Sequence, residues 1–258
     1  MSESPANPHW SIPLPAQLVH LDALVAFAER TASAVGTLLV GKKVPPWGAQ
    51  QNAAAAIVRL PGLLKAVAAL AEGGLAFEAD PLVRTLVELA ITSLWVGKDD
   101  SRAQMVWNDC MAALKEDGRR LGYVGVVFPP AAADAISWMN DLKTEGLARP
   151  PNLMEQARAA DDLAWVLYLG AYGMLSASTH ADPRPAIAIA SGGKTVSDAL
   201  EHIVALGRLA AYCILYAVGE VLGLDPEAVN ALHGPLAADT AALQMDIKPP
   251  TGRIRPEK

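Results

Sequence analysis

The stretch DDLAWVLYLGAYGMLSASTHADPR, residues 161–184, decides the fold. Residues 163–179 within it form the longest uncharged run of the chain, and a helix without charge must be buried in protein or in lipid. The run falls just short of the ~20 residues that span a bilayer, and Lys and Arg do not cluster at its ends. We therefore predict a buried core helix. At about 100° per residue, one stripe of it holds Trp165, Leu169, Tyr172, Ser176 and His180.

The polar end of this helix is the candidate site. Ser176 precedes His180 by one helical turn, and Asp182 and Arg184 follow directly. A histidine can act as a general acid or base near neutral pH. A serine nucleophile normally occupies a sharp turn, so Ser176 within a helix does not favour a serine hydrolase. Alternatively, His180 only caps the helix, because cationic histidine is favourable at a helix C-terminus.

The composition predicts an all-α protein. Of 258 residues, 52% are hydrophobic and only 5% aromatic, and Ala and Leu, which are strong helix formers, dominate the apolar set. We predict a single elaborated helical bundle of about seven helices with flexible N- and C-terminal arms. The arms are residues 1–14 and the Pro-containing tail 236–258, and the helical domain is 15–235.

Proline and glycine set the expected helix boundaries. Pro61-Gly62 should kink or split the second helix, and Asp80-Pro81 should begin the third, with Asp80 as N-cap. Residues 122–130 are the one stretch that could be extended, although a loop is the simpler interpretation. The expected helices are about 15–40, 50–71, 80–96, 100–121, 130–146, from 152 through the central run, 195–222, and a short one after 225.

Charge and cysteine content exclude several classes of protein. A net charge of -6 argues against a basic face on the scale that DNA needs, although a small basic patch stays compatible. The two cysteines lack metal-ligand spacing, and the N-terminus lacks the features of a signal peptide. We therefore expect a cytoplasmic protein without a cofactor or a metal site. Its partner is an unknown small molecule, RNA or protein, and a homodimer stays open.

A second group of polar residues lies on the expected third helix. Arg84 and Glu88 are four residues apart, so their side chains can meet, and Ile91 and Trp95 continue the same stripe. A charged pair on an apolar stripe is either an ordinary pair at the edge of the core or the floor of a polar site between helices. A metal ion could be bound by Glu88, His180 and Asp182, and Glu201-His202 could add to these ligands. The spacing of these residues, however, does not require a metal site.

These residues resemble a known family. Arg84-Thr-Leu-Val-Glu88 on one helix, followed by Tyr172 and Leu175-Ser176-Ala-Ser-Thr-His180 on a later one, resemble an uncharacterised bacterial helical family, the domain of unknown function 5677. The resemblance covers about residues 80–182 and implies a helical fold without an established activity. More distantly, the arrangement looks like the HEPN helical bundles, many of which cleave RNA.

The sequence departs from the HEPN signature, in which an Arg precedes a His by four to six residues. Arg184 follows His180 instead, although Arg84 could supply the positive charge from another helix. Two hypotheses follow. The chain is a HEPN-like, RNA-directed defence or stress protein with His180, Glu88 and Arg84 as catalytic residues. Alternatively, it is a non-catalytic interaction or ligand-binding module whose polar cluster is structural. In the first hypothesis the remaining residues bind the substrate: Tyr172, Ser176, Asp182 and Arg184.

Overall fold

A computed structural model describes residues 12–39, 48–123, 129–172, 175, 195–233 and 236. These residues form nine α-helices and one π-helical turn, and no strand occurs among them. The all-α prediction is confirmed. The elements are α1 (Leu14–Leu39), α2 (Ala49–Glu72), α3 (Ala76–Val96), α4 (Asp100–Tyr123), α5 (Pro130–Asn140), α6 (Leu153–Ala160), α7 (Asp162–Leu167), η1 (Tyr168–Tyr172), α10 (Val196–Leu222) and α11 (Pro226–Ala231).

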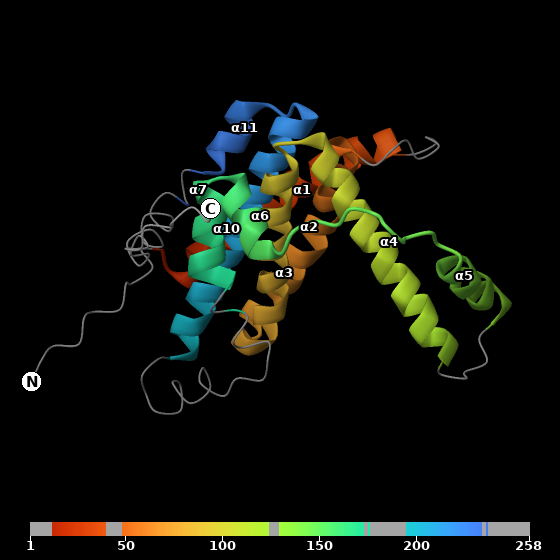
Figure 1. Ribbon diagram of the computed structural model, residues 1–258. Helices are drawn as coiled ribbons and strands as arrows, with labels where there is room; N and C mark the ends of the chain where they lie inside the picture. The colour runs from red at the N-terminus through yellow and green to blue at the C-terminus, as the bar shows by residue number, and fades with distance from the viewer. Residues whose placement is uncertain are drawn as a thin grey trace, which may run out of the picture.

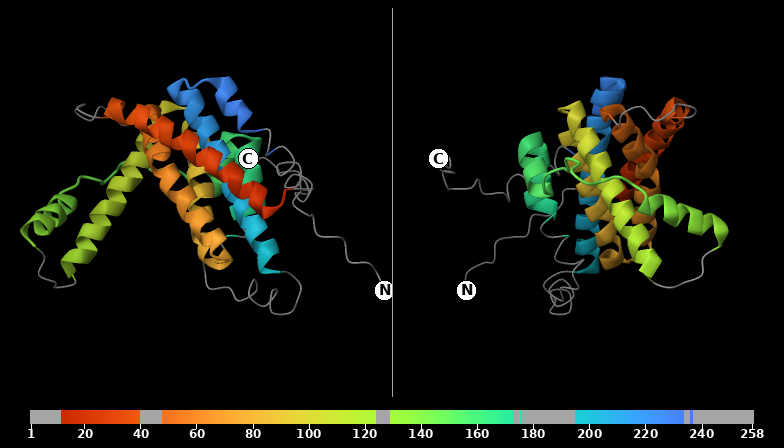
Figure 2. Two further views of the ribbon diagram at one scale, coloured as in Figure 1. Left: turned by 180° about the vertical axis from the view of Figure 1, so that it is seen from behind. Right: turned by 45° about the vertical axis from the view of Figure 1, so that its right-hand side comes forward.

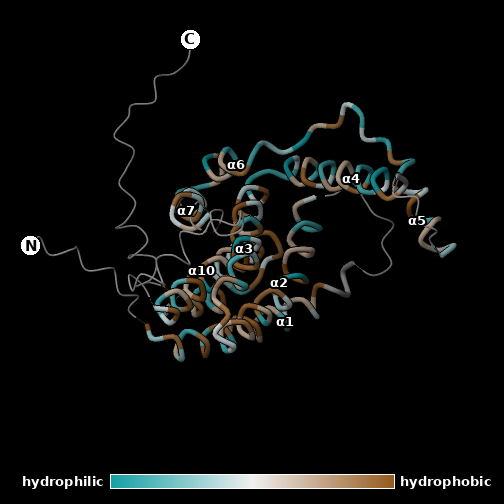
Figure 3. The backbone as a smooth tube through the Cα atoms, turned by 90° about the horizontal axis from the view of Figure 1, so that it is seen from below, coloured by the Kyte–Doolittle hydropathy of each residue, from teal (hydrophilic) through white to brown (hydrophobic). Residues whose placement is uncertain are grey.

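Helices α1, α2, α3 and α10 form the core bundle (Figure 1). Their small and branched apolar side chains form one buried cluster. Figure 3 shows the backbone of these helices from below, with hydrophobic residues in brown. Leu24, Ile57, Leu86 and Leu206, one from each helix, are completely buried. Helix α10 packs closely on α3 at Gly207, where an added Cβ would already touch Val83 at 3.5 Å. The abundance of Ala and Leu in the sequence therefore reflects close helix packing.

Two groups of helices flank this bundle. The segment α6–α7–η1 packs against α3, whereas α4 leaves the bundle at an angle and carries α5 at its far end (Figure 2). Helices α4 and α5 approach most closely at Gly118, where an added Cβ would lie only 2.7 Å from the Met139 side chain. The chain thus has a compact bundle with a protruding helical arm, and the angle between them leaves room for a groove.

Several predicted boundaries are correct and others are wrong. Gly97 ends α3, Thr195 caps α10 and Asp225 caps α11, as expected. Helix α3, however, begins at Ala76 and not at Asp80. The preceding turn buries Ala76 and Ala79, and this apolar packing extends the helix across Pro81 at the loss of one backbone hydrogen bond.

Helices α2 and α5 differ from expectation in length and continuity. Helix α2 runs unbroken through Pro61, because Ile57, Leu60 and Leu64 bury their side chains on both sides of the proline. Helix α5 ends at Asn140 and not near Gly146, which instead occupies a turn with φ +74°. A positive φ favours glycine, so Gly146 marks a loop rather than a helix end.

The predicted central helix is interrupted. Asn152 caps α6 as expected, but Asp161 is extended (φ -166°, ψ 179°) and its carboxylate caps a new helix through the Ala164 N–H at 2.9 Å. The π-helical turn η1 then shifts the phase of the side chains. Leu169 is 40% exposed, so its predicted place on a buried stripe with Trp165 and Tyr172 is wrong, whereas Ser176 and His180 of the same stripe lie outside the described residues. The buried side of the segment is made by Ala164, Leu167, Ala171 and Leu175.

Two described helices are long and apolar enough to cross a membrane by composition alone, namely α2 and α10. In α10, 83% of the most apolar window is buried inside the protein, whereas in α2 the buried share is 44%. Buried core helices pass the same test, so this finding is weak evidence for a membrane location. The uncharged run 163–179 is not among these helices in the part of the chain that is described.

Candidate functional site

Three of the predicted site residues meet on the side of α3 that faces η1. The guanidinium Nε of Arg84 donates to Glu88 Oε1 at 3.0 Å, and its Nη2 donates to the Tyr172 hydroxyl at 3.0 Å. The Arg84 guanidinium also lies 5.0 Å from the centre of the Tyr172 ring. One helix supplies Arg84 and Glu88 at i,i+4 spacing, and the π-helical turn presents Tyr172 to them.

The exposure of these side chains decides between the two interpretations of the charged pair. The Arg84 side chain is 21% exposed and that of Glu88 is 40% exposed, so the pair lies at the edge of the core. Partial burial works to lower the pKa of Arg84, but its hydrogen bonds to Glu88 and Tyr172 outweigh burial and raise the pKa above its ordinary value. Arg84 therefore stays cationic and acts as a fixed positive charge, not as a base.

An aromatic stack extends this cluster along the surface. The Tyr172 ring stacks on Tyr168 with centres 5.4 Å apart, and Tyr168 stacks on Trp165 at 5.8 Å. The Arg158 guanidinium lies 4.9 Å from the Trp165 ring at the other end, so an arginine covers each end of the stack. Since the ring faces already have partners, the stack fastens α6–α7–η1 in place.

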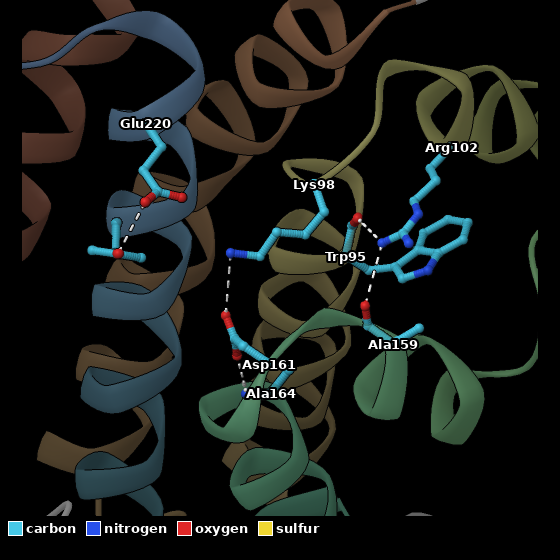
Figure 4. Close-up of polar contacts among 8 residues, drawn as sticks. Trp95, Lys98, Arg102, Ala159, Asp161, Ala164 and Glu220 are labelled. Carbon is cyan, nitrogen blue, oxygen red and sulfur yellow. Dashed lines mark hydrogen bonds and ion pairs between the residues drawn. The ribbon is translucent and has the colours of Figure 1, made fainter.

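The junction of α6 and α7 is tied to the turn between α3 and α4 by polar contacts (Figure 4). The Asp161 carboxylate lies 3.8 Å from Lys98 Nζ, while Arg102 Nη1 donates to the backbone oxygens of Trp95 at 2.9 Å and Ala159 at 3.4 Å. The Arg102 guanidinium also lies 5.1 Å from the Trp95 ring. These contacts fix the position of η1, and hence of Tyr172, relative to α3.

The remaining predicted site residues lie outside the described residues. These are Ser176, His180, Asp182 and Arg184. The structure therefore brings Arg84, Glu88 and Tyr172 together and leaves the assignment of the other four as a prediction. Glu201 and His202, in the first turns of α10, are half-buried. Among the described residues, no group of three His, Cys, Asp or Glu side chains is arranged to hold a metal ion.

A groove of about 400 Å³ opens between α2, α3 and α4, on the side of Glu88 away from the bundle core. Its surface is mostly apolar, and its polar groups are few. Glu88 belongs to both the groove and the Arg84 cluster, so the two features share a wall. The groove is lined by Asn52, Ala55, Ala56, Arg59, Thr85, Glu88, Leu89, Thr92, Val106, Trp107 and Cys110.

Two polar side chains of α2 line the groove without partners of their own. Asn52 is only 9% exposed as a residue, and its amide makes no hydrogen bond to a described residue. The amide atoms are not among the buried atoms without a partner, so they reach the solvent in the groove. Arg59 is exposed and has no carboxylate within ion-pair distance in the same part of the chain. Both side chains therefore keep hydrogen-bonding capacity that a ligand in the groove can use.

Sequence reasoning missed this groove. Its α2 residues occur in an alanine-rich helix, where Asn52 and Arg59 are seven residues apart and share one face. That spacing was the available signal, but only the angle of α4 shows that the face is open. Cys110 also lines the groove, and burial together with the nearby Asp109 raises the pKa of its thiol, which disfavours the thiolate form.

The described residues thus define an all-α helical bundle with an interhelical groove beside an arginine–glutamate–tyrosine cluster. The chain belongs to the family of unknown function DUF5677, whose sequence profile matches residues 53–190. The resemblance noted from Arg84, Glu88 and the later helix is confirmed, and the match begins 27 residues before Asp80, where the resemblance started. No curated protein and no solved structure matches the chain significantly.

Proposed function

We propose that the chain is a cytoplasmic small-ligand-binding protein whose site is the groove between α2, α3 and α4. One observation carries this proposal: the groove of about 400 Å³ is lined by Asn52, a residue only 9% exposed, whose amide makes no hydrogen bond to a described residue. Ligand sites are typically clefts of roughly 300–1,000 Å³ that combine an apolar lining with a few polar groups. The groove meets both criteria.

In this proposal the Arg84 cluster is a supporting wall. The hydrogen bonds of Arg84 to Glu88 and Tyr172 hold one groove residue, Glu88, in a fixed position. A residue locked by such contacts presents its remaining carboxylate oxygen to the groove in a defined direction. The cluster therefore takes no part in a reaction. Its role is to orient Glu88 toward the ligand.

Burial and thiol chemistry support the cytoplasmic location. Helix α10, one of the two described helices apolar enough to span a membrane, is largely covered by the bundle. Cys110 and Cys213 are both free thiols, and burial raises the pKa of the Cys213 thiol, so that it stays protonated and unreactive. Free thiols are usual in reducing compartments.

Filling the groove tests the proposal. Ala55 is exposed and lines the groove, so Ala55→Trp should occupy it at little cost to the fold. Val58 lies on the same helix, is 53% exposed and does not line the groove, which makes Val58→Trp the matched control. In a titration with an anilinonaphthalene dye, we expect fluorescence enhancement for wild type and Val58→Trp, and its loss in Ala55→Trp. Equal dye binding by all three proteins would refute the proposal.

A second candidate function is HEPN-like, RNA-directed catalysis with His180 as the base. It is favoured by the contact between Arg84 and Tyr172, because Tyr172 immediately precedes the segment that carries Ser176 and His180. His180 lies five residues after the described Leu175, hence within about 18 Å of it. Arg84 would then stabilise the charge on a phosphodiester undergoing cleavage.

Proton titration of the His180 ring tests this candidate. A histidine beside Glu88 has its pKa raised by the opposite charge and should lose much of that shift in Glu88→Gln. A histidine that only caps a helix should titrate identically in both proteins. The measurement is an NMR titration of wild type and Glu88→Gln. Identical curves would show that His180 does not lie beside Glu88.

A further inference from the structure

We propose that the groove recognises the adenosine monophosphate unit, either as a free purine nucleotide or as a nucleotide of single-stranded RNA. This inference rests on the proposed function and names the ligand class of the same groove. The observations that carry it are the positions of three polar side chains along the groove, namely Asn52, Glu88 and Arg59, and the chemistry that each still offers.

The order of these side chains follows from the helix geometry. The N–H of Ala49 at the start of α2 donates to the carboxylate of Asp100 at the start of α4, at 2.7 Å, so the two helices begin side by side. Asn52 lies one turn from this junction, and Arg59 lies seven residues further, about 10 Å along the helix. Asn52 therefore lies at the inner end of the groove, where α2 and α4 begin side by side. Arg59 lies at the opposite, outer end.

Asn52 is suited to a purine edge. Its amide offers one acceptor and two donors in a plane, and an asparagine amide pairs in two-point fashion with the N6 amino group and N7 of adenine. The amide makes no hydrogen bond to a described residue, so a base that binds here supplies hydrogen bonds that the described part of the fold does not. A base that lacks an adjacent donor and acceptor of this kind cannot pair with the amide at two points. We therefore expect such a base to bind with lower affinity.

The middle of the groove suits a planar ring. Trp107 and Ala56 both line the groove, and each is seven residues from the start of its helix, so they lie at about the same level. Leu89 and Val106 complete an apolar lining at this level. An apolar lining of this kind accommodates a planar ring, whose polar edge is then left to Asn52.

The outer end suits a ribose phosphate. Arg59 is exposed and has no carboxylate partner among the described residues, and a guanidinium binds phosphate through paired charge-assisted hydrogen bonds. Glu88 lies on the opposite helix, held by Arg84, and a carboxylate in such a position accepts from ribose hydroxyls. Asn52 thereby corresponds to the base, Glu88 to the ribose and Arg59 to the phosphate.

Calorimetric titration of the full chain tests the inference with defined probes. The probes are adenosine 5′-monophosphate, adenosine, uridine 5′-monophosphate and a six-nucleotide oligoadenylate RNA. We expect wild type to bind adenosine monophosphate at least about tenfold more tightly than either adenosine or uridine monophosphate, since a charge-assisted contact and a two-point base contact are each worth this much. An oligoadenylate that binds tenfold more tightly than the monomer assigns the site to RNA, and equal affinities assign it to the free nucleotide.

Substitutions then separate the roles. Arg59→Ala should weaken adenosine monophosphate about tenfold and leave adenosine unchanged, whereas Asn52→Leu should abolish the preference for adenine over uracil. The matched controls are Arg30→Ala and Trp138→Leu, exposed residues of α1 and α5 outside the groove, which should bind as wild type does. If dye binds in the groove but adenosine monophosphate does not, the nucleotide inference is overturned and the proposed function stands. If Asn52→Leu keeps the preference for adenine, the inference is likewise overturned.

Discussion

The Arg208 cluster in the bundle core and Asn52 in the groove are both polar, and they differ in whether their side chains have hydrogen-bond partners. In the core, Arg208 of α10 is fully buried, and its Nε donates to His20 Nδ1 of α1 at 2.9 Å. His20 Nε2 in turn donates to the backbone oxygen of Leu232 at 3.1 Å. In the groove, the Asn52 amide has no such partner among the described residues. The Arg208 cluster therefore joins helices, whereas the Asn52 amide keeps its hydrogen-bonding capacity for solvent or a ligand.

The protonation of His20 follows from this geometry. Arginine can only donate, so Nδ1 must be the acceptor and Nε2 carries the proton of a neutral ring. Burial, reinforced by the positive charge of Arg208, lowers the pKa of His20 to about 4. The core cluster therefore depends on a neutral histidine and joins α1, α10 and the end of α11.

The largest expected effect comes from removing the buried arginine. Arg208→Leu leaves the neutral His20 Nδ1 unmatched inside the core, which costs about 1–3 kcal/mol, and the lost packing of the largest fully buried side chain adds to that loss. The free energy of unfolding in urea, compared with wild type, measures this loss. A loss below about 1 kcal/mol would mean that the core cluster does not hold the helices together.

A smaller effect should appear when the pH is lowered. Because the folded pKa of His20 is depressed to about 4, its stabilisation is fully present above the unfolded value of about 6.5 and is lost as the pH falls towards 4. We expect a loss of about 2–3 kcal/mol across this window. Urea unfolding between pH 7 and 4 measures it, with His20→Gln as a control that keeps an acceptor and a donor but does not titrate there. Parallel pH profiles for the two proteins would contradict the assignment.

The Arg84 cluster should be far less sensitive than the Arg208 cluster. Its ion pair is partly exposed, with Glu88 at 40%, and exposed pairs contribute about 0–1 kcal/mol. Glu88→Ala should therefore lower the free energy of unfolding by less than about 1 kcal/mol, because Arg84 keeps its contact with Tyr172. A loss of several kcal/mol in the same urea experiment would show that the pair is a core element.

Much of the fold could be predicted from the sequence, because its signals are local. Gly97, Asn152, Thr195 and Asp225 end or begin helices through backbone and capping chemistry that a few residues determine. The errors arose where tertiary packing overrode such signals. Helix α3 extends across Pro81 because Ala76 and Ala79 are buried, and the central helix breaks where Asp161 turns its carboxylate to a new helix start.

The candidate site could be predicted only in part for a similar reason. Arg84 and Glu88 are joined by i,i+4 spacing, which the sequence displays, and Tyr172 was a candidate because it lies on the helical stripe of the central segment. The groove depends on the angle at which α4 leaves the bundle, and no local pattern encodes that angle. Arg208 and His20 are 188 residues apart, so their pairing was likewise invisible before the helices were packed.

The central claim, that the polar groups of the groove serve a ligand and not the fold, is tested most directly by the stability of Asn52→Leu without any ligand. Leucine has a similar size, removes an amide that makes no hydrogen bond to a described residue, and adds apolar contact. The free energy of unfolding in urea should therefore stay within about 0.5 kcal/mol of wild type or rise. Asn108, a buried asparagine that donates to the Ala148 oxygen at 2.8 Å, provides the control, since Asn108→Leu should lose about 1–3 kcal/mol. If Asn52→Leu loses as much as Asn108→Leu, Asn52 is a structural residue and the central claim is wrong.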